Sequence, residues 1–142
     1  MEQKLNTLLS DLVVTYHKIQ NFHWYTKGIN FYPIHEKLDE LYEGVLGAVD
    51  EVAETMLMLE MMPVASLRDF IENSSIEEAG ERGRSVEDIM KHLLADFEHL
   101  KAEVIVIKTQ ADEEMLYLVS ALMDSYIAQF CKNIWMIKQT LK

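Results

Sequence analysis

Histidines and carboxylates recur at helical spacing between His23 and Glu54. A helix turns about 100° per residue, so three carboxylates fall within roughly 100° of the imidazole of His35: Asp39, Asp50 and Glu54. A stripe that carries both imidazole and carboxylate offers the mixture of ligands that suits ferrous iron. The segment therefore predicts a metal-using helical protein.

The same stripe also carries Leu46, Ala53 and Leu57. A solvated helix face carries mostly polar residues, so this interleaving indicates a face that another surface covers.

Distance decides how such a site must be built. His35 and Glu54 are 19 residues apart, which is about 29 Å along a helix, whereas a metal–ligand bond is only about 2 Å long. Two antiparallel copies of the helix, crossing near residues 44 and 45, would bring the His35 and Asp39 end of one copy against the Asp50 and Glu54 end of the other. The spacing favours a two-fold dimer with two identical sites, each shared between chains.

Apolar periodicity predicts the elements that position these residues: helices over about 3–25, 32–61, 86–110 and 112–141, and a short helix over 66–72. Pro33 fits the first turn of the second helix, and Ser85 fits an N-cap. Three acids suit the dipole at the start of the last helix: Asp112, Glu113 and Glu114. Two hairpins joined by a long crossover predict an all-α, ferritin-like four-helix bundle with a short extra helix in the crossover between helices 2 and 3.

Each candidate ligand has a simpler interpretation. His23 lies on the apolar stripe of the first helix, where a lone histidine is most often a hydrogen-bonded core residue. Asp50 and Glu54 are spaced as ordinary surface acids, and His35 and Asp39 as an exposed helical pair. We expect Trp24 to pack at the dimer interface, with a role in absorbing oxidising equivalents as the alternative.

A rival ladder of metal-binding residue types lies on the third long helix: Asp88, His92, Asp96 and His99. These residues centre roughly 120° from the apolar stripe of that helix, so we interpret them as a solvated face. Cys131 is expected to be a small buried apolar residue.

Composition bounds the class of protein. At 142 residues the chain is expected to be one domain, residues 1–142, and no apolar run approaches the roughly 20 residues that span a bilayer. The first residues lack a basic segment followed by an apolar block, so no signal peptide is expected. The single Cys131 fits a reducing compartment, and a cytoplasmic location follows as the expectation.

The net charge of −11, with 24 acids against 13 bases, argues against nucleic acid as a partner. Proteins that bind nucleic acid draw most of their affinity from Lys and Arg at the phosphates. An acidic surface attracts cations instead.

The motifs resemble those of the Dps family, the DNA-binding proteins from starved cells, or miniferritins. The similarity extends over essentially the whole chain, and its most specific parts are these: HWYTKGINF at 23–31, HEKLDELY at 35–42, DEVAE at 50–54, PVASL at 63–67, SSIEE at 74–78 and Trp135-Met136. The resemblance implies a hollow dodecamer built from two-fold dimers. It also implies oxidation of ferrous iron, preferentially with hydrogen peroxide, storage of the ferric mineral and protection against oxidative stress.

The resemblance also implies roles for particular residues. Ferroxidase sites between subunits would take His23 and His35 from one chain and Asp50 and Glu54 from its mate, with Asp39 close by. Zinc tolerates the same ligands. Mineral nucleation would fall to Glu36 and Asp39. Negatively charged pores at a three-fold axis, near the start of the last helix, would admit iron, and the candidate acids are Asp112, Glu113, Glu114 and Asp124.

The chain departs from the family pattern in two places. Glu60 and Met61 stand where the family usually has a Gly-Gly pair, which affects the end of the second helix but no ligand. The chain also lacks a Lys-rich terminal extension, so DNA binding is not expected.

Three other functions are open at this stage: a non-enzymatic DNA-compacting nucleoid protein, a helical-bundle interaction protein, and a different di-metal enzyme of the ferritin-like class. The last would need paired Glu-x-x-His motifs, and none occurs.

Overall fold

Five helices and no strands make up the protein, and the computed structural model describes all 142 residues. The helices are α1 (Glu2–Tyr25), α2 (Phe31–Met58), α3 (Leu67–Asn73), α4 (Val86–Glu113) and α5 (Tyr117–Thr140). Each of the four long helices has at least 24 residues, and none is long and apolar enough to cross a lipid bilayer.

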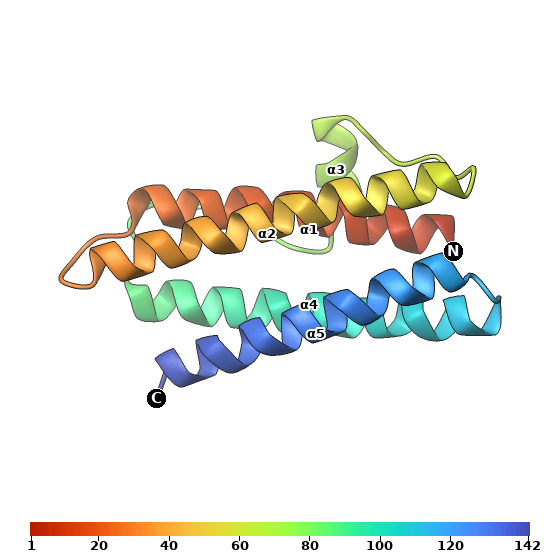
Figure 1. Ribbon diagram of the computed structural model, residues 1–142. Helices are drawn as coiled ribbons and strands as arrows, with labels where there is room; N and C mark the ends of the chain where they lie inside the picture. The colour runs from red at the N-terminus through yellow and green to blue at the C-terminus, as the bar shows by residue number, and fades with distance from the viewer.

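Two antiparallel hairpins form the bundle, as Figure 1 shows. Helix α1 packs chiefly on α2, and α4 packs chiefly on α5. A long crossover joins α2 to α4, and the short helix α3 within it lies against α1. The expected all-α, ferritin-like bundle with an extra helix in the crossover is therefore confirmed.

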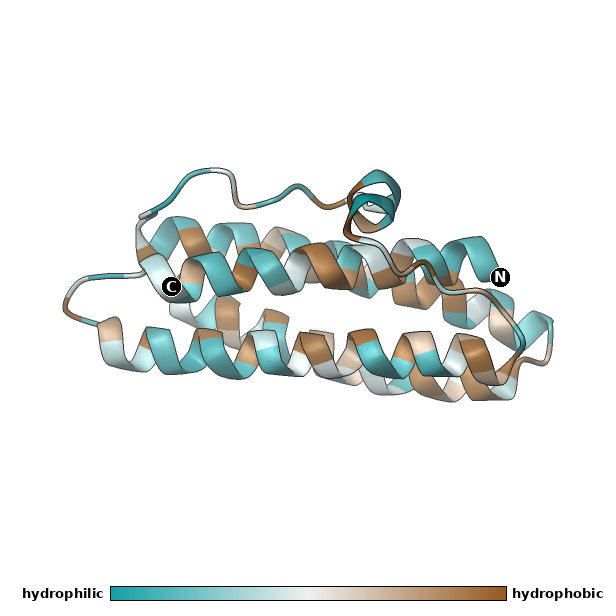
Figure 2. Cartoon of the chain, turned by 90° about the horizontal axis from the view of Figure 1, so that it is seen from above, coloured by the Kyte–Doolittle hydropathy of each residue, from teal (hydrophilic) through white to brown (hydrophobic).

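Figure 2 shows hydrophobic residues recurring along each long helix, the pattern of helices that pack an apolar stripe into a core. One cluster of buried side chains joins all four long helices, and its fully buried members include Leu12, Leu38, Phe97 and Phe130. Most polar side chains that could bind metal therefore lie outside the buried interior, and the buried acids Asp11 and Asp96 are exceptions.

Helix α2 ends at Met58, three residues earlier than the periodicity predicts. Glu60 adopts a left-handed backbone with φ of 59°. Its N–H donates to the carbonyl of Leu57 at 3.0 Å, and the N–H of Met61 donates to the carbonyl of Met56 at 2.9 Å. This pair of bonds is a Schellman C-cap, whose left-handed position favours glycine. Glu60 therefore shortens the helix at the cost of backbone strain.

The same motif corrects the predicted start of the last helix. Met115 has φ of 55°, and the N–H of Leu116 donates to the carbonyl of Ala111 at 2.8 Å. Helix α4 consequently extends to Glu113, and α5 begins only at Tyr117. Asp112 and Glu113 thus lie at the negative end of one helix dipole, so the prediction that they complement the start of the next was wrong.

The predicted solvated face of α4 is also wrong in part. Asp96 is buried and pairs with Lys18 of α1 at 2.8 Å, with side chains only 11% and 5% exposed. Burial raises the pKa of Asp96 although Lys18 opposes that shift. Periodicity missed this contact because an acid at the border of the apolar stripe is drawn inward by a cation on the neighbouring helix. Cys131, expected to be buried, is exposed.

Replacement of Glu60 by glycine tests the strained cap. Glu60→Gly should stabilise the fold by about 1 kcal/mol, because glycine adopts the left-handed conformation without a steric penalty. The measurement is the thermal midpoint at a fixed protein concentration.

Ala102→Gly, at an exposed position inside α4, is the matched control and should lose about 1 kcal/mol. A loss of stability in both variants would contradict the strain at Glu60.

Candidate metal centre

Reciprocal hydrogen bonds and ring stacking hold the imidazoles of His23 and His35 together across the turn that joins α1 to α2. Nδ1 of His23 lies 2.8 Å from the carbonyl oxygen of His35, and Nδ1 of His35 lies 2.8 Å from the carbonyl oxygen of His23. The two rings stack with centroids 3.7 Å apart and an interplanar angle of 18°. The last carbonyls of a helix lack intrahelical donors, so His35 also satisfies one such carbonyl at the end of α1.

These reciprocal contacts decide which ring nitrogen can bind metal. A carbonyl oxygen only accepts, so each Nδ1 must carry the proton and donate it. Each neutral imidazole then presents an unprotonated Nε2 with a free lone pair. A histidine that donates through one nitrogen to a carbonyl, and binds through the other, is the arrangement typical of metal ligands.

Asp39 lies on α2 one turn after His35 and faces the same place. Its Oδ1 is 3.9 Å from Nε2 of His23, so one carboxylate and one imidazole nitrogen converge. Tyr42 packs against His23 in an edge-to-face arrangement, with the ring centroids 5.3 Å apart. The neighbouring Asp39 carboxylate and burial raise the pKa of Tyr42 to about 12. The phenol therefore remains protonated beside the carboxylate at neutral pH.

Asp50 and Glu54 are exposed on the outer face of α2, away from both histidines. No ion pair or side-chain hydrogen bond within the chain satisfies either carboxylate. A single chain thus places His23 against His35 and near Asp39, and it leaves the other two proposed ligands apart, as the helical rise requires.

The outer face of α2 between the two ends carries a shallow groove lined by Glu43, Leu46, Gly47, Val49, Asp50 and Ala53. Leu46 is 46% exposed and Leu57 58% exposed. A Cβ added at Gly47 would meet nothing within 4 Å. These features leave room and apolar surface for a second helix where the antiparallel crossing was predicted. Trp24, also expected at that interface, is 63% exposed in the single chain.

The other expected site acids are solvent-facing. Glu36 is exposed, as are the four pore candidates. Lys108 bridges two of these, with Nζ 3.4 Å from Asp112 and 3.1 Å from Asp124. The bond from the Ser120 hydroxyl and the Lys108 charge lower the pKa of Asp112. The nearby carboxylates, Asp124 first, raise the pKa of Lys108. Two pore candidates are therefore partly neutralised.

A second group of metal-binding side chains was not predicted: Asp11 on α1 with His99 and Glu103 on α4. Asp11 is buried and its Oδ2 lies 3.0 Å from Nε2 of His99. Burial and the Asp11 charge raise the pKa of Glu103 to about 8. The signal in the sequence was an acid within the apolar run LLSDLVV, together with the one-turn spacing of His99 and Glu103.

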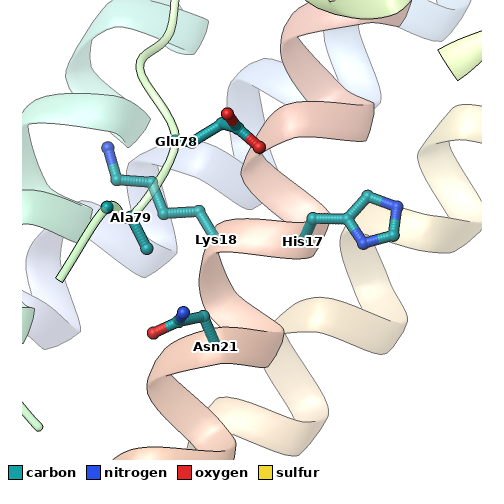
Figure 3. A pocket seen from close by; sticks show the side chains of 6 residues that line it. His17, Lys18, Asn21, Glu78 and Ala79 are labelled. Atoms are coloured by element: carbon teal, nitrogen blue, oxygen red, sulfur yellow. The ribbon is translucent and has the colours of Figure 1, made fainter. Parts of the chain in front are cut away.

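The cavity shown in Figure 3 lies elsewhere, between α1 and the crossover. It measures about 240 Å³ and is lined by His17, Lys18, Asn21, Glu78, Ala79 and Gly80. None of the predicted ligands borders it.

Known proteins resemble this chain over almost its whole length. The ferritin-like domain family matches residues 2–142. DNA protection during starvation protein 2 of Bacillus anthracis is 34% identical over 140 residues, which cover 96% of this chain and 93% of that protein. The DNA protection during starvation protein of Helicobacter pylori is 31% identical over 137 residues, 96% of this chain and 95% of that protein.

Solved structures agree. Dps from Listeria innocua is similar with a TM-score of 0.95 at 34% identity, covering 99% of this chain and 94% of that one. The antigen TpF1 from Treponema pallidum is similar with a TM-score of 0.97 at 30% identity, covering 99% and 90%. Each similarity extends through both helical hairpins and the crossover, so this chain belongs to the Dps family of ferritin-like proteins.

Proposed function

We propose that this protein oxidises ferrous iron at sites shared between two chains and stores the ferric product inside a hollow dodecamer. Hydrogen peroxide is the preferred oxidant, so the protein removes both reactants of radical-forming chemistry and protects against oxidative stress. The observation that carries the proposal is the pair of reciprocal hydrogen bonds between His23 and His35, which leaves Nε2 of both rings free and accompanies the approach of the His23 Nε2 to 3.9 Å from Asp39.

The donor set fits ferrous iron. Two neutral imidazoles and the carboxylates of Asp39, Asp50 and Glu54 match the nitrogen and oxygen ligands of non-haem iron. The set also accepts zinc, which would compete for the site. Few ligands leave coordination positions open for the oxidant, and the carboxylates stabilise the greater positive charge of the ferric product.

The dimer that completes the site follows from the outer face of α2. Asp50 and Glu54 have no partner in their own chain, and the groove beside Leu46 and Gly47 lies between them and the histidine end. An antiparallel mate seated there would place its two carboxylates opposite His35 and Asp39. The two-fold symmetry of this dimer creates a second identical site.

The reaction balances with peroxide as a two-electron oxidant. Two ferrous ions give one electron each, the O–O bond breaks, and two protons from solvent convert the two oxygen atoms to two water molecules, without release of hydroxyl radical. The ferric product hydrolyses to an oxyhydroxide and releases protons. Glu36 and Asp39 offer carboxylates on which mineral can begin, while a cytoplasmic location would supply the ferrous substrate.

Single substitutions on the two sides of the site should have the same effect. His35→Ala or Asp50→Ala should abolish fast peroxide-dependent oxidation, followed by stopped-flow absorbance, and leave the particle assembled. Bundle packing rests instead on buried residues such as Leu38 and Val45. Full activity in either variant would contradict the assignment of His35 and Asp50 to the ferroxidase site. If the wild-type protein fails to bind ferrous ion, the function as a helical-bundle interaction protein is favoured instead.

Mixed particles test whether the site is shared. In a dimer of one His35→Ala chain and one Asp50→Ala chain, both defects fall in one site and the other is intact. Equal random mixing should therefore restore about a quarter of the sites. Recovery of no activity would place both side chains in the same chain's site.

Iron entry should depend on the pore acids that no lysine neutralises. Lys108 already offsets the charges of Asp112 and Asp124, so the other two acids are the ones to replace. Glu113→Gln with Glu114→Gln should slow iron uptake at low salt, because it removes negative charge that attracts Fe²⁺. Added salt should shrink the effect, because it screens that attraction. Glu72→Gln with Glu77→Gln removes the same charge from exposed positions near the crossover and should change little. Equal slowing by both pairs would argue for net charge rather than a pore.

The alternative function, DNA compaction, is disfavoured by the charge of −11. We expect no retarded band in a gel shift with duplex DNA near 0.15 M salt, because the long-range electrostatic interaction is repulsive. A chelator must be present, since divalent cations can bridge two acidic partners. A shifted band under those conditions would restore DNA binding as a function.

A further inference from the structure

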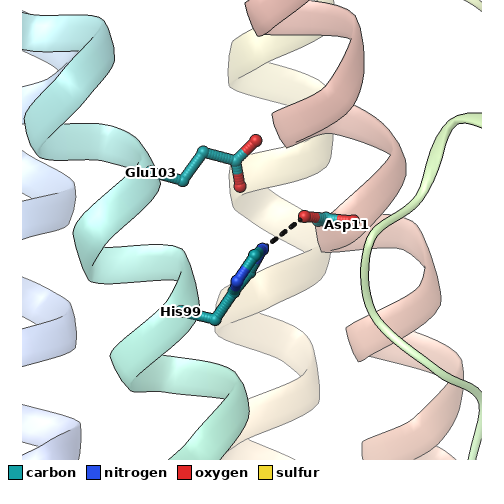
Figure 4. Close-up of side chains that lie close together, drawn as sticks. All are labelled: Asp11, His99 and Glu103. Carbon is teal, nitrogen blue, oxygen red and sulfur yellow. Dashed lines mark hydrogen bonds and ion pairs between the residues drawn. The ribbon is translucent and has the colours of Figure 1, made fainter.

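Three metal-binding side chains meet inside the chain where α1 packs against α4 (Figure 4). The carboxylate of Asp11, the imidazole of His99 and the carboxylate of Glu103 each offer one ligand atom, and these atoms all lie within 4.8 Å of one another. No other group of three such residue types in the chain meets that condition. His99 and Glu103 are one helical turn apart, so they project from the same side of α4.

Asp11 is fixed in orientation before any ion arrives. Its side chain is fully buried, and its Oδ1 accepts from the Ser74 hydroxyl at 2.7 Å and from the N–H groups of Ser75 at 2.5 Å and Ile76 at 3.3 Å. These bonds occupy one carboxylate oxygen with the crossover. The other oxygen, Oδ2, points at His99, as a ligand held by outer hydrogen bonds would.

Glu103 adds to the cluster a buried carboxyl oxygen that has no partner in the chain. Its Oε2 is buried and has no hydrogen-bond donor. A carboxylate oxygen removed from water without a donor is strongly unfavourable, and a second buried carboxylate beside it makes the electrostatic energy worse. No Lys or Arg pairs with Asp11 or Glu103. A cation placed between Asp11, His99 and Glu103 would satisfy all three groups.

We propose that Asp11, His99 and Glu103 form a second divalent metal site, contained within one chain, for a first-row cation such as Zn²⁺, Fe²⁺ or Mn²⁺. One imidazole nitrogen with two carboxylates suits these ions, whereas Mg²⁺ and Ca²⁺ prefer oxygen alone. Bonds of about 2.0–2.2 Å place the donors of one ion about 3–4 Å apart. The 3.0 Å separation of Asp11 and His99 is already of that order.

The site is separate from the centre at His23. Asp11 and His23 lie 12 residues apart on α1, which is about 18 Å along the helix. The cluster needs no partner chain, so an ion can bind before assembly. The His99 side chain, 44% exposed, provides the route of entry and leaves room for a water ligand. An ion there would link α1 to α4 directly, and it would link both to residues 74–76 of the crossover through Asp11. Metal binding should therefore stabilise the folded chain.

Cobalt(II) is the probe, because it replaces these ions and its visible absorbance reports imidazole and carboxylate ligation. Chelator-stripped protein is dialysed against Co²⁺ at neutral pH, and bound metal is counted per chain. Glu103→Gln and His99→Gln should each remove one equivalent per chain, together with the rise in thermal midpoint that Co²⁺ produces. His35→Ala with Asp50→Ala silences the shared centre and should leave that equivalent in place.

His92→Gln is the matched control, because Nε2 of His92 lies 3.8 Å from Asp88 on the same helix without a third ligand. It should leave the count unchanged. If Glu103→Gln and His99→Gln bind as much Co²⁺ as the wild type, the proposal is overturned. It is also overturned if the His35→Ala, Asp50→Ala protein binds none. The shared centre is judged separately, by the metal lost in that double variant.

Discussion

The reciprocal hydrogen bonds between His23 and His35 are the constraint on which the metal centre depends. They join the end of α1 to the first turn of α2, so the same two bonds set the geometry of the hairpin turn and place a proton on Nδ1 of both rings. A ring held by its Nδ1–H cannot rotate away, and its Nε2 remains available as a ligand. Folding of the hairpin therefore preorganises half of the proposed site, while the helical rise of α2 assigns the other half to a second chain.

The sequence predicts the fold well because the apolar stripes of four long helices determine it. Periodicity also identifies which side of α2 carries His35, Asp39, Asp50 and Glu54, since angular position on a helix follows from spacing alone. It fails where a tertiary contact or an unusual backbone decides the outcome. The left-handed backbone of Met115 moves the start of α5. The sequence does not predict this conformation, because the usual residue at such a position is glycine and this one is methionine.

Contacts between helices account for the other differences. Asp96 lies at the border of the α4 stripe, and only the position of Lys18 on α1 explains its burial. The reciprocal hydrogen bonds of the two histidines could not be predicted from the sequence either. Residue spacing identifies neighbours along one helix, but it does not show which carbonyl a ring nitrogen contacts. The sequence thus predicts the identity of the candidate ligands, whereas their orientation requires the structure.

The excess of acids has opposite consequences at the surface and inside. Exposed acids such as Glu36 remain hydrated and attract cations at little cost to stability. Buried acids need partners: Lys18 neutralises Asp96, while the crossover N–H groups and His99 satisfy Asp11. Glu103 has no such partner, and its carboxyl must hold either a proton or a share of a metal ion. In a protein whose proposed task is to gather iron, that choice links the stability of the bundle interior to the supply of divalent metal.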